Sequence, residues 1–372
     1  MRRALGLALV ALAATPGAAY AATGAEVAAR LSAQREAHGI PGGITENPEW
    51  SARCAKHVAW IEQNNRLEHG EEPGTPGYSE DGDWAGRNSN LARFQGLDFN
   101  RGNPYLHAPY HLLGLLHPAM ESIGASENGE IGCHTTFPGF TRPAPAVDTF
   151  YSYPGDGTTI AWSEEAHELP SVPGDEVGLP EGTITGPNME VFWRGPDGAP
   201  RLDFLVAATL NDAGGSAVDV RTVGRAQSKF VIAGSGFVIP AKPLQPGTTY
   251  SASATFSAQD GSRSFTGRWS FKTVPLPSPK KAIKIKLANT KTQGLLVTLT
   301  GAGPYDGRVA SVTIDYGRGT SKLKTKIPLG NTLQATPVKK GKTVTVTTSV
   351  KAFSLSGVNV PAAKAVKTLK AK

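Results

Sequence analysis

Cysteine is scarce in this sequence, and its scarcity limits the chemistry that the chain can carry. Only Cys54 and Cys133 occur among 372 residues, and neither belongs to a CxxC pair. A zinc–thiolate site, which needs several closely spaced thiolates, is therefore not expected. The sequence also has no GxSxG and no SxxK followed by KTG. The motifs of the common serine-nucleophile hydrolases are thus missing.

Long apolar runs are missing too, apart from one short run at the N-terminus. Arg2 and Arg3 precede the apolar stretch Ala4–Ala14, and Ala19-Tyr20-Ala21 has the small-x-small pattern of a cleavage site. This arrangement predicts a signal peptide over residues 1–21, because the run is too short to cross a bilayer. We expect a protein that is secreted or held at the cell surface or cell envelope. An uncleaved N-terminal membrane anchor is the alternative.

Export would place the two cysteines in an oxidising compartment, where a pair is usually bonded. A Cys54–Cys133 disulfide would close a loop of about 80 residues and contribute roughly 4 kcal/mol to stability in the chain-entropy model. Two buried free thiols are the alternative.

Acidic residues are nearly absent from one end of the chain. Residues 276–372 contain 18 Lys or Arg but only Asp306 and Asp315, a net charge of +16, whereas the remaining residues have a net charge of −9. Such a basic segment favours a polyanionic partner, which for an exported protein would be an anionic envelope polymer. Nucleic acid is not expected as a partner, because the protein is exported and this segment has few aromatic residues. A charged face that prevents edge-to-edge aggregation would explain the lysines equally well.

Helical periodicity is confined to the first part of the chain. It extends over residues 25–63, where Pro41-Gly42-Gly43 separates a first helix from the amphipathic stretch Ala52–Ile61. A loop rich in Gly, Glu and Pro is expected over Gly70–Gly82. A third helix is expected over Ala108–Leu116, which has a proline near its start and another just past its end.

From about residue 143 the pattern changes to short alternating runs separated by Pro and Gly. Runs at intervals of roughly 10–15 residues are typical of a β-sandwich. The segment 275–279 (PLPSP) is interpreted as a stiff linker, and the alternation resumes after it. In residues 320–326 (TSKLKTK) the lysines occupy every second position, so they are expected to share one sheet face. The runs are 189–193, 203–210, 217–223, 236–240, 248–256 and 268–274 before the linker, and 283–287, 294–300, 309–316, 320–329 and 342–353 after it.

Five short motifs between Glu26 and Phe137 occur in the order and spacing of a known family. They are Leu31 with Gln34-Arg35, Gly39 and Pro41; Ala52–Trp60 leading to Leu67 and His69; Gly86-Arg87-Asn88; Ala108-Pro109-Tyr110-His111; and Leu116, Pro118 and Ile123-Gly124. With them the segment resembles the CAP superfamily (SCP domain) of cysteine-rich secretory, antigen 5 and pathogenesis-related class 1 proteins, in its bacterial secreted form. Residues 150–273 resemble the Ig-like domain that follows this module in some secreted proteins.

The resemblance implies the fold class and the domain organisation. We expect an α+β protein, with an α-β-α sandwich (the CAP-like domain) followed by two β-sandwich (Ig-like) domains. The expected boundaries are 1–21 for the signal peptide, 24–145 for the CAP-like domain, 146–275 for the Ig-like β-sandwich and 280–372 for the basic β-sandwich.

The resemblance also implies a cleft in which two histidines and two acidic residues converge, and some family members bind a divalent metal there. His69 and His111 match the histidine positions and would be the ligands of such an ion, for example Zn²⁺. Arg87 stands where the family has a glutamate, and an arginine repels a cation. Glu80, or else Glu71 or Glu72, would then supply the carboxylate. The cleft candidates are therefore His69, Glu80, Arg87, Asn88 and His111.

These observations favour a non-enzymatic, exported protein whose cleft binds a small molecule, lipid or peptide. One alternative is a hydrolase that acts through His69, His111 and an acidic partner. It requires a carboxylate within hydrogen-bond reach of one of these histidines, next to an open cleft. The other alternative is a purely structural or adhesive surface protein in which the Ig-like domains are the functional part.

Overall fold

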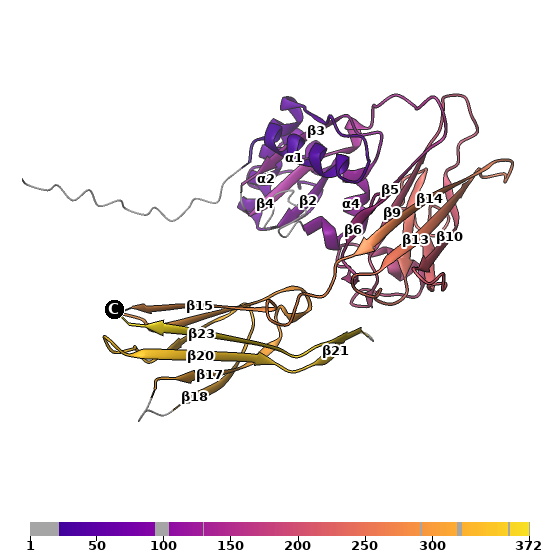
Figure 1. Ribbon diagram of the computed structural model, residues 1–372. Helices are drawn as coiled ribbons and strands as arrows, with labels where there is room; N and C mark the ends of the chain where they lie inside the picture. Colours follow the sequence, from indigo (N-terminus) through magenta and orange to yellow (C-terminus); the bar gives the residue numbers. More distant parts are fainter. Residues whose placement is uncertain are drawn as a thin grey trace, which may run out of the picture.

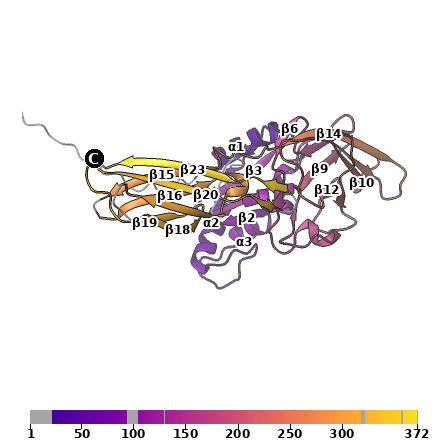
Figure 2. The same cartoon turned by 60° about the horizontal axis from the view of Figure 1, so that its bottom comes forward.

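The computed structural model describes residues 22–93, 104–128, 130–290, 292–317, 322–355 and 358–371. The chain forms two bodies, a larger one that ends near residue 275 and a smaller one made of strands (Figure 1, Figure 2). The predicted signal peptide, residues 1–21, lies outside the described residues. Within the described ranges no helix is both long and apolar enough to cross a membrane.

The N-terminal part of the larger body consists of helices around a small sheet. Its helices are α1 (Gly24–Glu36), α2 (Pro48–Asn64), α3 (Glu80–Arg87) and α4 (Pro109–Leu116). Three of them begin at a side-chain cap, in which an oxygen of Thr23, Asn47 or Ser79 accepts a backbone N–H of the first turn. The sheet contains β1 (Thr45–Glu46), β3 (Ser122–Glu127), β4 (Ile131–Thr135) and β2 (Ser89–Arg93), in that order. Two short 3-10 turns complete this part. The turn η1 (Pro104–His107) precedes α4, and η2 (Phe137–Gly139) follows β4.

The second part of the larger body is a β-sandwich. One sheet has the order β11-β12-β9-β5 and the other β10-β13-β14-β6. All pairings are antiparallel except that of β14 with β6. The strands are β5 (Thr149–Tyr153), β6 (Thr158–Ile160), β9 (Met189–Arg194), β10 (Phe204–Asp212), β11 (Val220–Val223), β12 (Ser235–Pro240), β13 (Thr249–Ser257) and β14 (Ser264–Thr273), with a small pair, β7 (Glu164–Glu165) and β8 (Ile184–Thr185), and the turn η3 (Pro173–Val177) between them.

The smaller body is a second β-sandwich with its own hydrophobic core. Its sheets have the orders β15-β16-β19 and β18-β17-β20-β23, and β21 pairs with β22 as a separate hairpin. The two β-sandwiches that the alternating runs predict are thus confirmed. The elements are β15 (Ile283–Thr290), β16 (Gly294–Gly301), η4 (Gly303–Tyr305), β17 (Val309–Asp315), β18 (Leu323–Pro328), β19 (Thr332–Ala335), β20 (Thr343–Val350), β21 (Phe353–Leu355), β22 (Val358–Val360) and β23 (Ala363–Lys370).

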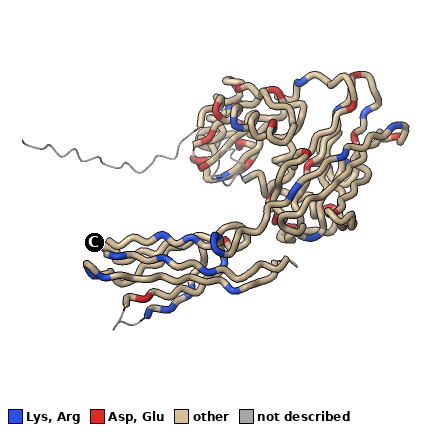
Figure 3. The backbone as a smooth tube through the Cα atoms, viewed as in Figure 1, with Lys and Arg blue, Asp and Glu red and all other residues tan. Residues whose placement is uncertain are grey.

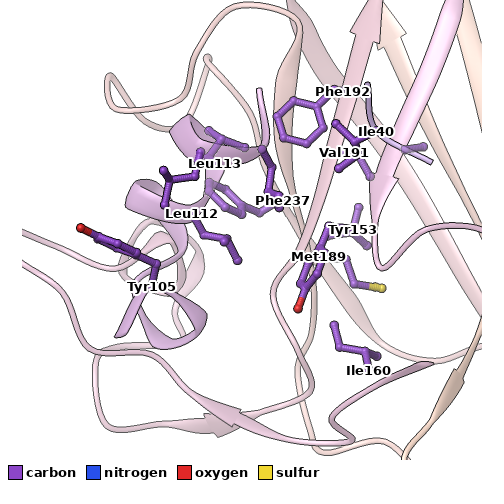
Figure 4. Close-up of a cluster of buried hydrophobic side chains, with 14 of the residues drawn as sticks. Ile40, Tyr105, Leu112, Leu113, Tyr153, Ile160, Met189, Val191, Phe192 and Phe237 are labelled. Atoms are coloured by element: carbon purple, nitrogen blue, oxygen red, sulfur yellow. The ribbon is translucent and has the colours of Figure 1, made fainter. Parts of the chain in front are cut away.

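The predicted fold class, α+β with an α-β-α sandwich followed by two β-sandwich domains, is wrong. Strands make up 39% of the described residues and helices, with the 3-10 turns, 18%, so the described part of the protein is mostly β. The physical reason lies in the core of the larger body. Leu112 and Leu113 of α4 belong to the same hydrophobic cluster as Phe192 of β9 and Phe237 of β12 (Figure 4). Helices α1 and α4 therefore share a core with the first β-sandwich.

The disulfide is confirmed. Cys54 of α2 is bonded to Cys133 of β4, with the two Cα atoms 5.6 Å apart. Both residues are fully buried, in a separate apolar cluster that includes Trp60 and Ile61 of α2. The bond therefore fixes α2 to one face of the N-terminal sheet.

Candidate functional site

His69 and His111 lie next to each other. Their ring centroids are 6.2 Å apart and the rings are nearly parallel, with 16° between their planes. His69 lies in the loop between α2 and α3, and His111 lies in the first turn of α4. The ring of Tyr105, 6.0 Å from that of His111, continues the stack on the other side.

Helix α3 positions His69. The His69 Nδ1–H donates a hydrogen bond to the Gly86 carbonyl oxygen at 2.8 Å. A Cβ atom at Gly86 would lie 2.3 Å from the His69 carbonyl oxygen and 2.4 Å from the His57 ring, so only glycine allows this approach. Burial lowers the pKa of His69, against the hydrogen bond to Gly86, which raises it. The ring is therefore neutral at physiological pH, and its Nε2 has a lone pair.

Glu168 positions His111, although it belongs to the first β-sandwich, 57 residues further along the chain. One carboxylate oxygen accepts a hydrogen bond from His111 Nδ1 at 2.8 Å and the other accepts one from the Tyr110 backbone N–H at 2.9 Å. Burial raises the pKa of Glu168, and the hydrogen bond from His111 opposes this rise. The carboxylate thus orients the imidazole and accepts the Nδ1 proton, so that Nε2 is the nitrogen with the lone pair when the ring has a single proton.

Of the other predicted site residues, Arg87 lines the cleft, whereas Asn88 and Glu80 do not. Arg87 lines the same cleft as the two histidines, and its side chain is 62% exposed and paired with Asp83 at 2.8 Å. Asn88 ends α3, and its side chain donates to the Trp84 carbonyl. Glu80 is exposed in the first turn of α3 and does not line the cleft.

Neither of the other two carboxylates proposed for the cleft, Glu71 and Glu72, lines it, and Glu72 forms an ion pair with Arg66 at 2.8 Å. Glu71 forms its hydrogen bonds elsewhere. It is buried and accepts hydrogen bonds from His57 Nδ1 at 3.0 Å and from the Ser79 backbone N–H at 2.8 Å. Two residues that contact the predicted site residues, His57 and Glu168, were not predicted from the sequence. The signal for His57 is its position on the buried face of α2, one residue before Val58.

The cleft is lined by both apolar and polar side chains. Its volume is about 290 Å³, and its polar lining includes the exposed His69, the half-buried His111 and the buried Ser89 and Asn90. The apolar lining includes three side chains with exposed fractions of 47% for Phe137, 85% for Leu169 and 37% for Phe230. Leu169 and Phe230 come from the β-sandwich, so both parts of the larger body build the cleft.

The donor set does not fit a resident zinc ion. Catalytic zinc sites have three protein ligands and structural sites four. In the part of the chain that the structure describes, no group of three or more His, Cys, Asp or Glu side chains could hold a metal. His69 and His111 supply two nitrogens, and the only charged side chain on the cleft wall besides them is the cation Arg87. The residues that line the cleft therefore do not fit the expected divalent metal.

A further carboxyl group is buried in the first β-sandwich without a hydrogen bond among the described residues. Glu190 of β9 is 1% exposed, opposite Phe237 and Tyr153 on the neighbouring strands. Neither of its carboxyl oxygens has a hydrogen-bond partner among the described residues. Burial raises the pKa of Glu190 well above its usual value, and the neighbouring Glu164 raises it further. Burial therefore favours the protonated, neutral form of this group.

Comparisons with known proteins bear on the fold only. No family model matches the chain, and no curated protein matches it. A two-domain fibronectin type III segment from chicken tenascin is 16% identical, with 49% of this chain and 91% of that chain covered and a TM-score of 0.19. The FN1-FN3 domains of chicken CNTN1 are 16% identical, with 50% and 62% covered and a TM-score of 0.21. Because these scores are low, the assignment of the β-sandwiches depends on the strand pairing. The CAP resemblance gains no support from the comparisons.

Proposed function

We propose that this protein is exported and that its larger body binds an amphipathic ligand in the cleft beside His69 and His111. The observation that carries this proposal is that three exposed apolar side chains, Phe137, Leu169 and Phe230, line the same cleft as the two histidines. Concave sites lined by apolar groups with a few oriented polar groups are typical of small-molecule binding.

The hydrogen bonds of the two histidines indicate which polar group the ligand has. Both Nδ1 atoms donate to oxygens, of Gly86 and of Glu168. A ring whose single proton is on Nδ1 offers Nε2 as an acceptor, and a hydroxyl group is the complementary donor. A lipid, a sterol or a peptide with a hydroxyl group has this chemistry.

Titration of the purified full-length protein with a fluorescent fatty alcohol tests this proposal. Leu169→Ser should weaken binding about ten-fold, because burial of a leucine side chain contributes about 1.5–3 kcal/mol and part of it is lost. Val206→Ser is the matched control, since Val206 is an exposed apolar residue of β10 outside the cleft. His111→Gln should weaken binding of the fatty alcohol more than binding of the corresponding alkane. Equal effects of the two serine variants would contradict the proposal.

A hydrolase is the second candidate, and the contact of Glu168 with His111 is the observation that favours it. A carboxylate that accepts a hydrogen bond from Nδ1 stabilises the imidazolium that forms when Nε2 accepts a proton from water. His111 would then be the general base, and Glu168 would position it.

Ester and peptide substrates with an apolar tail test this second candidate. Turnover by the parent protein should be lost in His111→Gln and reduced about 100-fold in Glu168→Gln, whereas Val206→Ser should retain it. Absence of turnover in the parent, or turnover that His111→Gln leaves unchanged, would eliminate the hydrolase.

The location is also a proposal. The N-terminal pattern of residues 1–21 and the disulfide support export, and the net charge of residues 276–372 supports attachment to an anionic envelope polymer. We expect the exported protein to begin after Ala21, which N-terminal sequencing of the cell-surface fraction checks. Deletion of 276–372 should release the protein into the medium. The CAP resemblance of residues 26–137 and the expected domain boundaries remain proposals that rest on sequence motifs.

A further inference from the structure

One face of the second β-sandwich consists of hydroxyl groups between two rows of lysines. The sheet has the order β18-β17-β20-β23. Along its inner strands the buried residues alternate with exposed or half-buried ones, such as Ala310 and Val312 with Ser311 and Thr313 on β17. On β20 the outward positions are Thr343, Thr345, Thr347 and Ser349. Antiparallel partners share a face, so the register extends this outer face to the edge strands.

Lysines occupy the outer face on both edge strands. On β18, Lys326 pairs with Ser311 and Lys324 with Thr313. On β23, Lys364 pairs with Ser349 and Lys370 with Thr343. All four side chains are exposed. We call Lys324, Lys326, Lys364 and Lys370 the lysine rows.

The lysine rows are separated by three strand spacings, about 14 Å, and the hydroxyl groups of β17 and β20 lie between them. Asp315 is the one acidic residue within these four strands. Its Oδ2 forms an ion pair with Lys322 Nζ at 2.9 Å, which compensates its charge. Figure 3 shows that Lys and Arg dominate this body, whereas Asp and Glu gather on the larger one. The face therefore attracts anions along its length.

We propose that this face binds a linear anionic polysaccharide of the envelope. The inference rests on the proposed envelope attachment and names the surface and the partner class responsible for it. Lysine ammonium groups on either side would pair with carboxylate or phosphate groups, and the threonine and serine hydroxyls between them would bond to sugar hydroxyls. A glycan fits better than a lipid surface, because the face is flat and mostly hydroxylic, with Val309 and Val366 as its exposed apolar side chains.

Alginate is the probe, and a second set of lysines in the same body provides the matched control. The test variant is K324Q/K326Q/K364Q/K370Q. The control variant, K284Q/K286Q/K339Q/K340Q, removes the same charge from outward positions of β15 and from the loop before β20. Binding of the purified full-length proteins is measured across a salt series, with neutral dextran as a further control. Thermal unfolding followed by circular dichroism establishes that both variants are folded.

The test variant should bind alginate at least ten-fold more weakly than the parent and with a smaller salt dependence, because fewer ion pairs are made. The control variant should stay within about three-fold of the parent. Equal weakening of both variants would show that net charge alone attracts the polymer. Preference of the parent for anionic vesicles over alginate, or its self-association through this face, would also overturn the inference. If the purified protein binds alginate through this face but is not retained at the cell surface, the proposed location fails and the inference stands.

Discussion

The buried carboxyl group of Glu190 makes the stability of the larger body depend on pH in a definite direction. In the unfolded chain a glutamate releases its proton near pH 4.3. In the folded protein, burial keeps the pKa of Glu190 well above that value. The folded state therefore binds the extra proton, and the contribution of this group is most favourable below about pH 4.3. It is lost progressively as the pH rises towards the folded pKa.

The magnitude follows from the linkage relation, in which one retained proton costs about 1.4 kcal/mol per pH unit. Between pH 5 and pH 7 the unfolding free energy should therefore fall because of Glu190, by no more than about 3 kcal/mol, which is the limit for one proton over two pH units. Glu190→Gln keeps the shape of the side chain but cannot ionise. The variant and the parent should differ little at pH 5, and the variant should be the more stable one at pH 7.

Urea unfolding followed by tryptophan fluorescence is the appropriate assay, because all six tryptophans lie between residues 50 and 269 and report on this body alone. Glu176→Gln, at an exposed position of the same body, is the control and should follow the parent at every pH. If Glu190→Gln loses stability with pH as steeply as the parent, Glu190 ionises inside the folded protein and the reasoning is refuted.

Three further predictions concern what holds the larger body together. Replacement of both Cys54 and Cys133 by serine should lower its unfolding free energy by about 4 kcal/mol, since the bond closes a loop with a sequence separation of 79; an unchanged urea midpoint would contradict this. Phe237→Ala should cost about 3–5 kcal/mol and should increase hydrogen exchange in α4 as well as in the sandwich, whereas exchange limited to the sandwich would argue against the common core. Arg35→Met should cost about 3 kcal/mol or more, because its guanidinium donates to the carbonyl oxygens of Pro41, Leu115 and His117; a loss below about 1 kcal/mol in urea unfolding would contradict it.

Local pattern predicted most of the secondary structure. The expected helix Ala52–Ile61 lies within α2, and the run 189–193 lies within β9. Helix α3 was missed, since Gly70–Gly82 was expected to be a loop. Its signals were present in Ser79 as the cap and in three acidic residues of the first turn, but two glycines obscured them.

Contacts between distant segments could not be predicted in this way. Periodicity shows that the face of α4 is apolar, but not that the ring of Tyr110 meets that of Phe237 at 5.4 Å. The fold class was predicted wrongly because the sequence does not show what covers this apolar face. A helix face covered by a strand has the same pattern as one covered by another helix. Glu168 was missed for the same reason, since nothing near it in the sequence points to His111.

The contact of Glu168 with His111 has a consequence for how this protein can change over generations. Modules that only follow one another along a chain can be exchanged by recombination at the linker. A crossover near residue 145 would here separate an imidazole from its carboxylate and remove Leu169 and Phe230 from the lining of the cleft. The first two parts of the chain are therefore expected to be inherited as one unit. The basic sandwich has a core of its own that begins at Ala282, but Val358 of its β21–β22 hairpin belongs to the core of the larger body, so loss of this sandwich would expose part of that core.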